Sequence, residues 1–353
     1  MNEIKADTSN MLEIEDLSVE FRTHDRTVYA VNHLNLSVKK GQTLGLVGET
    51  GAGKTTAGLA ALDLIQSPPG IITSGRITVN GKNVICTKTD NKGKQVAKTC
   101  LTKKELQSMR GKTISMIFQD PMTSLNPVLT VERQIAEVIE HHEHLGYTDA
   151  TAKAREMLEL VGIPGERGVE YPHQFSGGMK QRVVIAMALA CDPQLLIADE
   201  PTTALDVTIQ AQVLDMMKKL REQHNTSMLM ITHDLGIVAD ICDCVSVIYA
   251  GSVVEHGTLE DVFDHTLHPY TRGLFDSLPN MEDRSARLKP IRGLMPDPSK
   301  LPEGCAFADR CDYALEKCSK EKPEIFYRND EHYVACHLYN EHSIQEGGVL
   351  KNE

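Results

Sequence analysis

The chain has 353 residues, of which 41% are hydrophobic and 24% charged, and its formal net charge is −12 at pH 7. This length allows a large buried core and indicates two or three domains. The acidic balance argues against a protein that coats nucleic acid, because such a protein needs a basic surface. Residues 1–10 are polar and predict a loose leader without a secretory signal, and the longest apolar run, Val183 to Cys191, is too short to span a bilayer.

The first predicted elements are strands between residues 11 and 47. From Leu12 to Phe21 apolar and polar residues alternate, as in a strand with one buried face. Thr43 to Val47 is a short apolar run typical of a buried strand, and Thr56 to Ile65 after it has the character of a helix.

A phosphate-binding motif lies between that buried strand and that helix. Its glycines let the backbone curl around a phosphate, whose charge is met by N–H groups at the start of the helix and by Lys54. Thr55 is placed to bind Mg²⁺ through its hydroxyl, and Thr56 follows it directly. The sequence therefore predicts binding of ATP or GTP. The full G-x-x-x-x-G-K-[ST] motif is Gly48, Glu49, Thr50, Gly51, Ala52, Gly53, Lys54 and Thr55.

Three further regions complete the middle of the chain. Ser74 to Val79 and Val84-Ile85 are predicted to form a hairpin around Asn80-Gly81. Residues 86–107 are rich in lysine and predict an exposed insertion. Residues 128–165 space their apolar side chains at a helical period, and from Leu195 onward strands and helices alternate, as in a mostly parallel sheet.

Five polar segments follow the phosphate-binding motif in the chain. Each is unremarkable alone, since a Gly-Gly pair is usually a turn, an Asp-Glu pair a solvated strand end, and a single His a surface residue. Their key residues are Gln119 after Ile117-Phe118; Ser176, Gly177, Gly178 and Met179; Asp199 and Glu200 at the end of an apolar strand; Asp206; and His233 at the end of a second apolar strand.

Together these residues suit phosphoryl transfer, which depends on positioning and charge more than on covalent chemistry. Asp199 can bind Mg²⁺, Glu200 can orient the attacking water, and Gln119 can contact both. His233 can donate a hydrogen bond to the γ-phosphate. Ser176 at the start of a helix marks a second anion site, of the same physical kind as the first loop.

Taken in order, the segments resemble the ATP-binding subunits of ABC transporters over roughly residues 11 to 260. In that family they are the Q-loop, the signature motif, Walker B, the D-loop and the H-loop. The resemblance implies an α/β fold with a P-loop ATPase core, a mixed sheet, an antiparallel edge sheet and a helical subdomain at about residues 120–190. It also implies a head-to-tail dimer, in which one subunit's signature loop closes on the ATP of the other. An aromatic near the end of the first strand stacks on adenine in this family, so Phe21 is either that residue or part of the core.

A narrower resemblance points to the oligopeptide/dipeptide (and nickel) importers. It is carried by residues 119–127, by His268-Pro269-Tyr270-Thr271 and by the tail after Pro290. It implies a heterodimer with a second ABC ATPase, or alternatively a homodimer, on the cytoplasmic side of the membrane. It further implies two transmembrane permeases and an extracellular substrate-binding protein, while the cargo, peptide or nickel, cannot be read from this chain.

The C-terminal region, residues 261–353, contains four cysteines with spacings x5, x6 and x17 in a segment with little apolar sequence. Such a segment usually needs a covalent or metal staple, and disulfides are not expected in a cytosolic ATPase. Four thiolates suit Zn²⁺ or an iron–sulfur cluster, and the resemblance favours [4Fe–4S], with Zn²⁺ and plain thiols as alternatives. The other five cysteines (Cys86, Cys100, Cys191, Cys242 and Cys244) are interpreted as structural or incidental. The four candidate ligands are Cys305, Cys311, Cys318 and Cys336.

The sequence thus predicts an ATP-hydrolysing subunit that energises an importer of di- or oligopeptides. One rival is an ABC ATPase of DNA repair or translation, but such proteins commonly carry paired cassettes or coiled coils, and this chain shows one cassette and no heptads. The other rival is a scaffold with an inactive site. Lys54, Asp199, Glu200 and His233 are all present, which argues against it.

Overall fold

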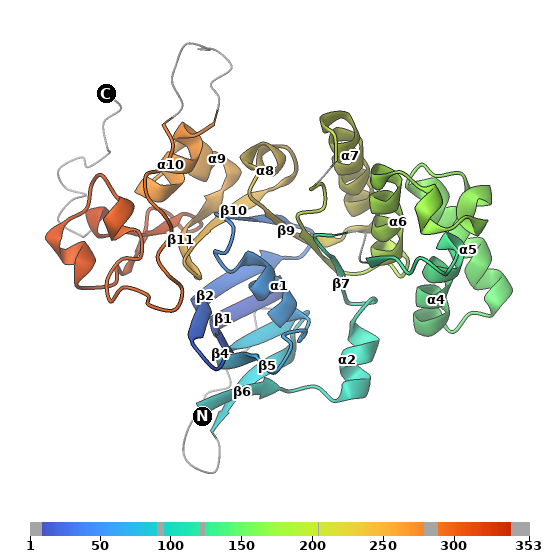
Figure 1. Cartoon of the computed structure of the whole chain (residues 1–353), viewed down its shortest axis with the longest axis horizontal. Helices are drawn as coiled ribbons and strands as arrows, with labels where there is room; N and C mark the ends of the chain where they lie inside the picture. The colour runs from blue at the N-terminus through green and yellow to red at the C-terminus, as the bar shows by residue number, and fades with distance from the viewer. Residues whose placement is uncertain (1–8, 90–94, 121–123, 204, 279–288, 340–353) are drawn as a thin grey trace.

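The computed structural model describes residues 9–89, 95–120, 124–203, 205–278 and 289–339. The predicted leader therefore lies almost wholly outside the described residues, as do residues 121–123 of the segment after Gln119. Two sheets and several helices make up the described part (Figure 1). No helix in that part is long and apolar enough to cross a membrane.

An eight-stranded sheet forms the centre of the molecule, in the order β12-β13-β11-β10-β3-β9-β8-β7. Strands β10, β3, β9, β8 and β7 are parallel, as predicted, while β11, β13 and β12 continue the sheet in antiparallel pairing. The parallel strands are apolar and buried because both faces of the sheet are covered. The bounds are β3 Thr43–Val47, β7 Ile114–Ile117, β8 Leu195–Asp199, β9 Ser227–Thr232, β10 Cys244–Tyr249, β11 Ser252–Thr258, β12 Ile325–Tyr327 and β13 Tyr333–Ala335.

A second, antiparallel sheet has the order β2-β1-β4-β5-β6. The predicted hairpin at Asn80-Gly81 is present, and both turn residues have positive φ, 45° and 75°, as a two-residue turn of this kind requires. The bounds are β1 Asn10–Arg22, β2 Thr27–Lys39, β4 Gly70–Val79, β5 Lys82–Thr89 and β6 Gln95–Thr99.

The residues of 86–107 whose burial the structure describes are exposed or partly exposed, as predicted, apart from Leu106, but the described part of the segment has regular structure and is not a loop. These residues complete β5, form β6 and add α2, Lys103–Met109, so they extend the antiparallel sheet to its edge. Lysine-bearing strands suit a sheet edge, because charge there discourages pairing with other chains. Cys86 and Cys100 were interpreted as structural or incidental, and disulfides were not expected; the β5–β6 pairing brings the two together, and they form a disulfide.

The helices follow the predicted pattern with two adjustments. Helix α1 runs from Lys54 to Ala61 and is shorter than predicted, because Leu62 caps it and Asp63 follows with φ of 52°. The helical stretch at 128–165 is two helices, separated at His144, which takes a left-handed conformation. The other bounds are α4 Val131–Glu143, α5 Tyr147–Leu160, α6 Gly177–Leu189, α7 Val207–His224, α8 Leu235–Ile241, α9 Leu259–Asp264, α10 Pro269–Asp276 and the 3₁₀ turns η1 Gly165–Val169, η2 Pro172–Gln174, η3 Ala308–Arg310, η4 Glu316–Ser319 and η5 His337–Tyr339.

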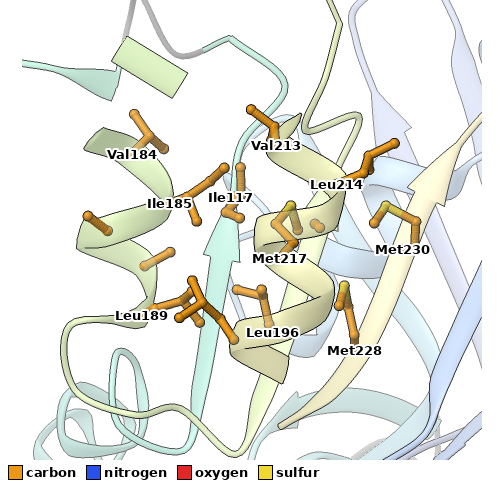
Figure 2. Packing of buried hydrophobic residues seen from close by; sticks show 14 of the residues in the cluster. Ile117, Val184, Ile185, Leu189, Leu196, Val213, Leu214, Met217, Met228 and Met230 are labelled. Atoms are coloured by element: carbon orange, nitrogen blue, oxygen red, sulfur yellow. The ribbon is translucent and has the colours of Figure 1, made fainter. Parts of the chain in front are cut away.

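Two apolar cores cover the two faces of the eight-stranded sheet. On one face, residues such as Leu44, Ile197 and Ile231 pack with α1 and the antiparallel sheet. On the other, Leu196, Met228 and Met230 pack against α6 and α7 (Figure 2). Successive residues of a strand point to opposite faces, so both cores use the same strands. The strand ends that carry the polar residues are thereby held from two sides.

Candidate functional site

The phosphate-binding loop lies between β3 and α1, as predicted. A Cβ on Gly48 would stand 2.2 Å from the Ile248 carbonyl oxygen, and one on Gly53, whose φ is 100°, would stand 2.3 Å from the Ala30 carbonyl oxygen. Both positions therefore require glycine. Lys54 is 5% exposed and its Nζ donates to the carbonyl oxygens of Gly48, at 2.6 Å, and Glu49, at 3.0 Å. The loop thus curls around a cationic group.

Asp199, the last residue of β8, lies at the same loop. It is 2% exposed, its Oδ1 has no hydrogen-bond partner, and it accepts a hydrogen bond from Thr55. Burial raises the pKa of Asp199 and lowers the pKa of Lys54. An unsatisfied carboxylate oxygen beside a hydroxyl is a donor set that Mg²⁺ accepts, so these residues fit the predicted ion.

Glu200 gathers the other predicted catalytic residues around its carboxylate. Gln119 Nε2 donates to Oε2 at 2.9 Å, and His233 Nδ1 lies 2.9 Å from Oε1. Thr203 Oγ1 also donates to Oε2, at 3.0 Å. Burial alone would raise the pKa of Glu200, but the hydrogen bonds from His233, Thr203 and Gln119 hold it below its usual value. The carboxylate is therefore kept charged and fixed in orientation.

This grouping follows from the parallel sheet. Gln119 comes shortly after β7, Glu200 directly after β8 and His233 directly after β9, and these strands are neighbours. Glu200 itself has φ of 46°, a left-handed conformation that is uncommon for a residue with a side chain and that is held by a hydrogen bond from its N–H to the Ile231 carbonyl. Sequence reasoning missed Thr203, although its place in the turn after Glu200 was a usable signal.

The signature residues lie elsewhere in the molecule. Ser176 caps α6 by accepting a hydrogen bond from the Met179 N–H, and Gly178 lies so close to α7 that a Cβ would stand 2.6 Å from Ile209 Cγ2. Asp206 caps α7 in the same way, by accepting from the Ile209 N–H. In Figure 1, α6 lies well apart from α1. A single chain therefore does not bring its own signature residues to its own phosphate loop.

Phe21 lies near the end of β1 and is partly buried. A Cβ on Gly70, its partner across the sheet, would stand 3.1 Å from Phe21 Cε1. The ring therefore rests at the margin of the core, and its role toward adenine stays a prediction.

The four C-terminal cysteines line one small cavity of about 10 Å³, and none of them is in a disulfide. Burial raises the pKa of Cys305 and Cys311, and raises the pKa of Cys336 to about 12. The four thiols thus lie around the same cavity. However, among the described residues no group of three or more His, Cys, Asp or Glu side chains is arranged to hold a metal ion.

Comparison with known proteins gives two family matches. A model described as "ABC transporter" matches residues 31–203, and one described as "Oligopeptide/dipeptide transporter, C-terminal region" matches residues 254–318. The chain is 47% identical over 333 residues to the oligopeptide transport ATP-binding protein OppD of Bacillus subtilis, covering 94% of this chain and 89% of that protein. It is 44% identical to the dipeptide transport ATP-binding protein DppD of the same organism, covering 96% and 98%.

Among solved structures, a dimeric post-hydrolysis state of the ATP-binding cassette MJ0796 bound to ADP and Pi matches with a TM-score of 0.59 and 23% identity. It covers 70% of this chain and 99% of that one. At this identity the likeness supports the fold alone.

Proposed function

The chain belongs to the ATP-binding subunits of ABC transporters, in their oligopeptide/dipeptide group, and from this membership we propose that it hydrolyses ATP to power peptide import. The observation that carries the proposal is the carboxylate of Glu200, which Gln119, Thr203 and His233 hold beside the phosphate-binding loop. Such a group is suited to orient a water molecule for attack on the γ-phosphate.

In this proposal the residues of the loop hold the nucleotide and those of the strand ends do the chemistry. Backbone N–H groups from Gly48 to Thr56, with Lys54, take the phosphates, and Phe21 stacks on adenine. Thr55, Asp199 and Gln119 would hold Mg²⁺, which when bound would offset negative charge on the phosphates. Because Nδ1 of His233 is engaged by Glu200, Nε2 is the ring atom left to donate to the γ-phosphate.

The site is completed by a second subunit. The helix start at Ser176, Gly177, Gly178 and Met179 is an anion site that lies apart from this chain's own loop, so we assign it to the ATP of a partner. Asp206 would lie at the same junction. A second, different ABC ATPase is the proposed partner, with a second copy of this chain as the alternative. ATP would close the pair and hydrolysis would reopen it, which is a gating cycle rather than chemistry on the cargo.

Peptides are the proposed cargo because the similar curated proteins are named for oligopeptide and dipeptide transport. The cargo would be selected by an extracellular binding protein and two permeases, with this subunit peripheral on the cytoplasmic side. We place the ATPase domain at residues 11–260, with the helical subdomain at about 120–190, and a separate C-terminal region at 261–353.

We also propose that the four C-terminal thiols bind a [4Fe–4S] cluster, with Zn²⁺ as the alternative. The support is that Cys305, Cys311, Cys318 and Cys336 share one cavity and remain unpaired. Bound metal would act as a staple for a region with few apolar side chains.

The deciding experiment reconstitutes the chain with its permeases and partner ATPase in proteoliposomes. Peptide-loaded binding protein should stimulate ATP hydrolysis and peptide uptake together, and Lys54→Ala should lose both because the loop no longer holds ATP. If nickel rather than peptide stimulated ATP hydrolysis, the assigned cargo would be nickel. Hydrolysis without any membrane partner in a pull-down would favour a non-transport ATPase.

A further inference from the structure

The C-terminal region reaches back to the phosphate-binding loop through one arginine. Arg310 Nη1 donates to Glu49 Oε2 at 3.1 Å, and Nη2 lies 3.0 Å from Glu49 Oε1. The guanidinium and the carboxylate therefore form a bidentate ion pair. The Arg310 side chain is 7% exposed. It also donates to the Tyr249 hydroxyl at 3.1 Å and, through Nε, to the Arg292 carbonyl at 2.9 Å. These two further hydrogen bonds fix the orientation of the Arg310 guanidinium.

Two more contacts join the same region to the same loop. The hydroxyl of Tyr270, which is fully buried in α10, accepts a hydrogen bond from the Glu49 N–H at 3.0 Å. Met295 lies against Gly51, with its Cε 3.4 Å from where a Cβ would stand. Both backbone and side chain of Glu49 are thus fixed by residues more than 200 positions further along the chain.

Glu49 is an acidic residue in a loop that must accept a polyanion. An unpaired carboxylate there would repel the phosphates, and it could turn inward to pair with Lys54, whose Nζ already lies 3.0 Å from the Glu49 carbonyl oxygen. Burial lowers the pKa of Lys54, and the negative charge of Glu49 raises it. Pairing with Arg310 would prevent both the repulsion of the phosphates and the inward turn of Glu49 toward Lys54.

We propose that Arg310 is a positioning residue of the ATP site, which neutralises Glu49 and aims it away from the bound phosphates. This inference rests on the proposed ATP site at residues 48–56. It makes the C-terminal region part of the nucleotide site, rather than an appendage that only meets partners. It also assigns a use to the residue that directly precedes Cys311, one of the four thiols at the cavity.

The test compares the affinity of the full-length chain for Mg·ATP among four proteins by isothermal titration. Arg310→Ala should bind about tenfold more weakly than the parent, because an unpaired charge is left near the phosphates. Glu49→Gln removes the charge that Arg310 is proposed to neutralise, so its measured affinity is the reference for the double variant. The double variant should bind like Glu49→Gln. Arg328→Ala, an exposed arginine of the same region, is the matched control and should leave affinity unchanged.

The double variant separates positioning from mere support. If it binds as weakly as Arg310→Ala, the arginine supports the fold and the proposal is overturned. If Arg310→Ala fails to fold, as judged by its thermal unfolding, Arg310→Lys with and without Glu49→Gln makes the same comparison. A parent protein that binds no ATP overturns the proposed function itself, whereas normal binding by the parent and by Arg310→Ala overturns only this inference.

Discussion

The ATPase core and the C-terminal region differ in the interactions that stabilise them. In the core, every residue of β3, β8, β9 and β10 is buried, and the strands share a continuous hydrogen-bond ladder. After α10 the residues that the structure describes form two strands of three residues each and short 3₁₀ turns. The core is therefore held mainly by apolar burial, whereas the C-terminal region combines fewer buried apolar side chains, such as Phe307 and Val334, with specific polar contacts.

One buried pair shows the polar attachment most clearly. Glu255 of β11 and His332, just before β13, are both fully buried, and their side chains meet at 3.1 Å. Glu255 also accepts hydrogen bonds from the N–H groups of Leu267, at 2.7 Å, and His268, at 3.0 Å. A single carboxylate thus joins the sheet, the start of α10 and the segment that leads into β13. A buried hydrogen-bond network of this kind stabilises the fold only while every donor and acceptor in it is present.

The largest effect should come from the core, with Glu200→Gln. The amide keeps the shape of the side chain but loses the charge that orients water, so ATP hydrolysis should fall by at least about 100-fold while ATP binding persists. Steady-state hydrolysis and nucleotide binding are measured on the same assembled transporter. Glu260→Gln, at an exposed glutamate of α9, is the control. Normal turnover in Glu200→Gln would remove the assigned role, unless the partner's site carries all the hydrolysis.

Glu255→Ala should loosen the C-terminal region. It leaves His332 Nε2, the buried N–H of His268 and the partly buried N–H of Leu267 without this acceptor, which costs about 3–5 kcal/mol. Hydrogen exchange should increase from residue 259 onward while β3, β8 and β9 stay protected. Glu331→Ala, whose side chain is half exposed, should change little. Equal loss of protection in both regions would mean that they unfold as one unit.

The next prediction tests whether the four C-terminal thiols bind a metal that stabilises their region. Protein purified without oxygen should be brown, with broad absorbance near about 400 nm from thiolate-bound iron. Cys311→Ser should impair the stability of this region or its docking to partners more than it impairs ATP binding. Colourless protein with stoichiometric zinc would decide for the alternative ion. Complete alkylation of all four thiols in native protein would exclude a metal site.

A smaller, pH-dependent effect is expected at His256 of β11. Burial lowers the pKa of His256 to about 4, so the ring is neutral in the fold. The unfolded chain binds a proton near pH 6.5, so stability should fall as the pH drops from about 6.5 to 4 and change no further below that. Because the ring is only partly buried, we expect a loss of order 1 kcal/mol. His256→Gln should flatten this part of the stability profile, as measured by urea unfolding at several pH values.

Sequence patterns predicted the core far better than the C-terminal region. Residues such as Lys54, Asp199 and His233 stand at the ends of apolar strands or at a glycine-rich turn, so local pattern places them. The end of β5 and the edge strand β6 were missed because the lysines of this segment resemble those of a loop, although they suit a sheet edge. The contacts of Arg310 with Glu49 and of His332 with Glu255 join distant segments, and no local period reports them.

The place of β13 has a practical consequence for anyone who shortens this chain. β11 pairs with β10 along one side and with β13 along the other. A protein that stops before residue 325 would leave the outer side of β11 with unpaired N–H and carbonyl groups, open to strands of neighbouring molecules. Truncated forms are therefore expected to aggregate during recombinant expression even when the ATPase fold is intact, and their poor solubility should not be read as a defect of catalysis.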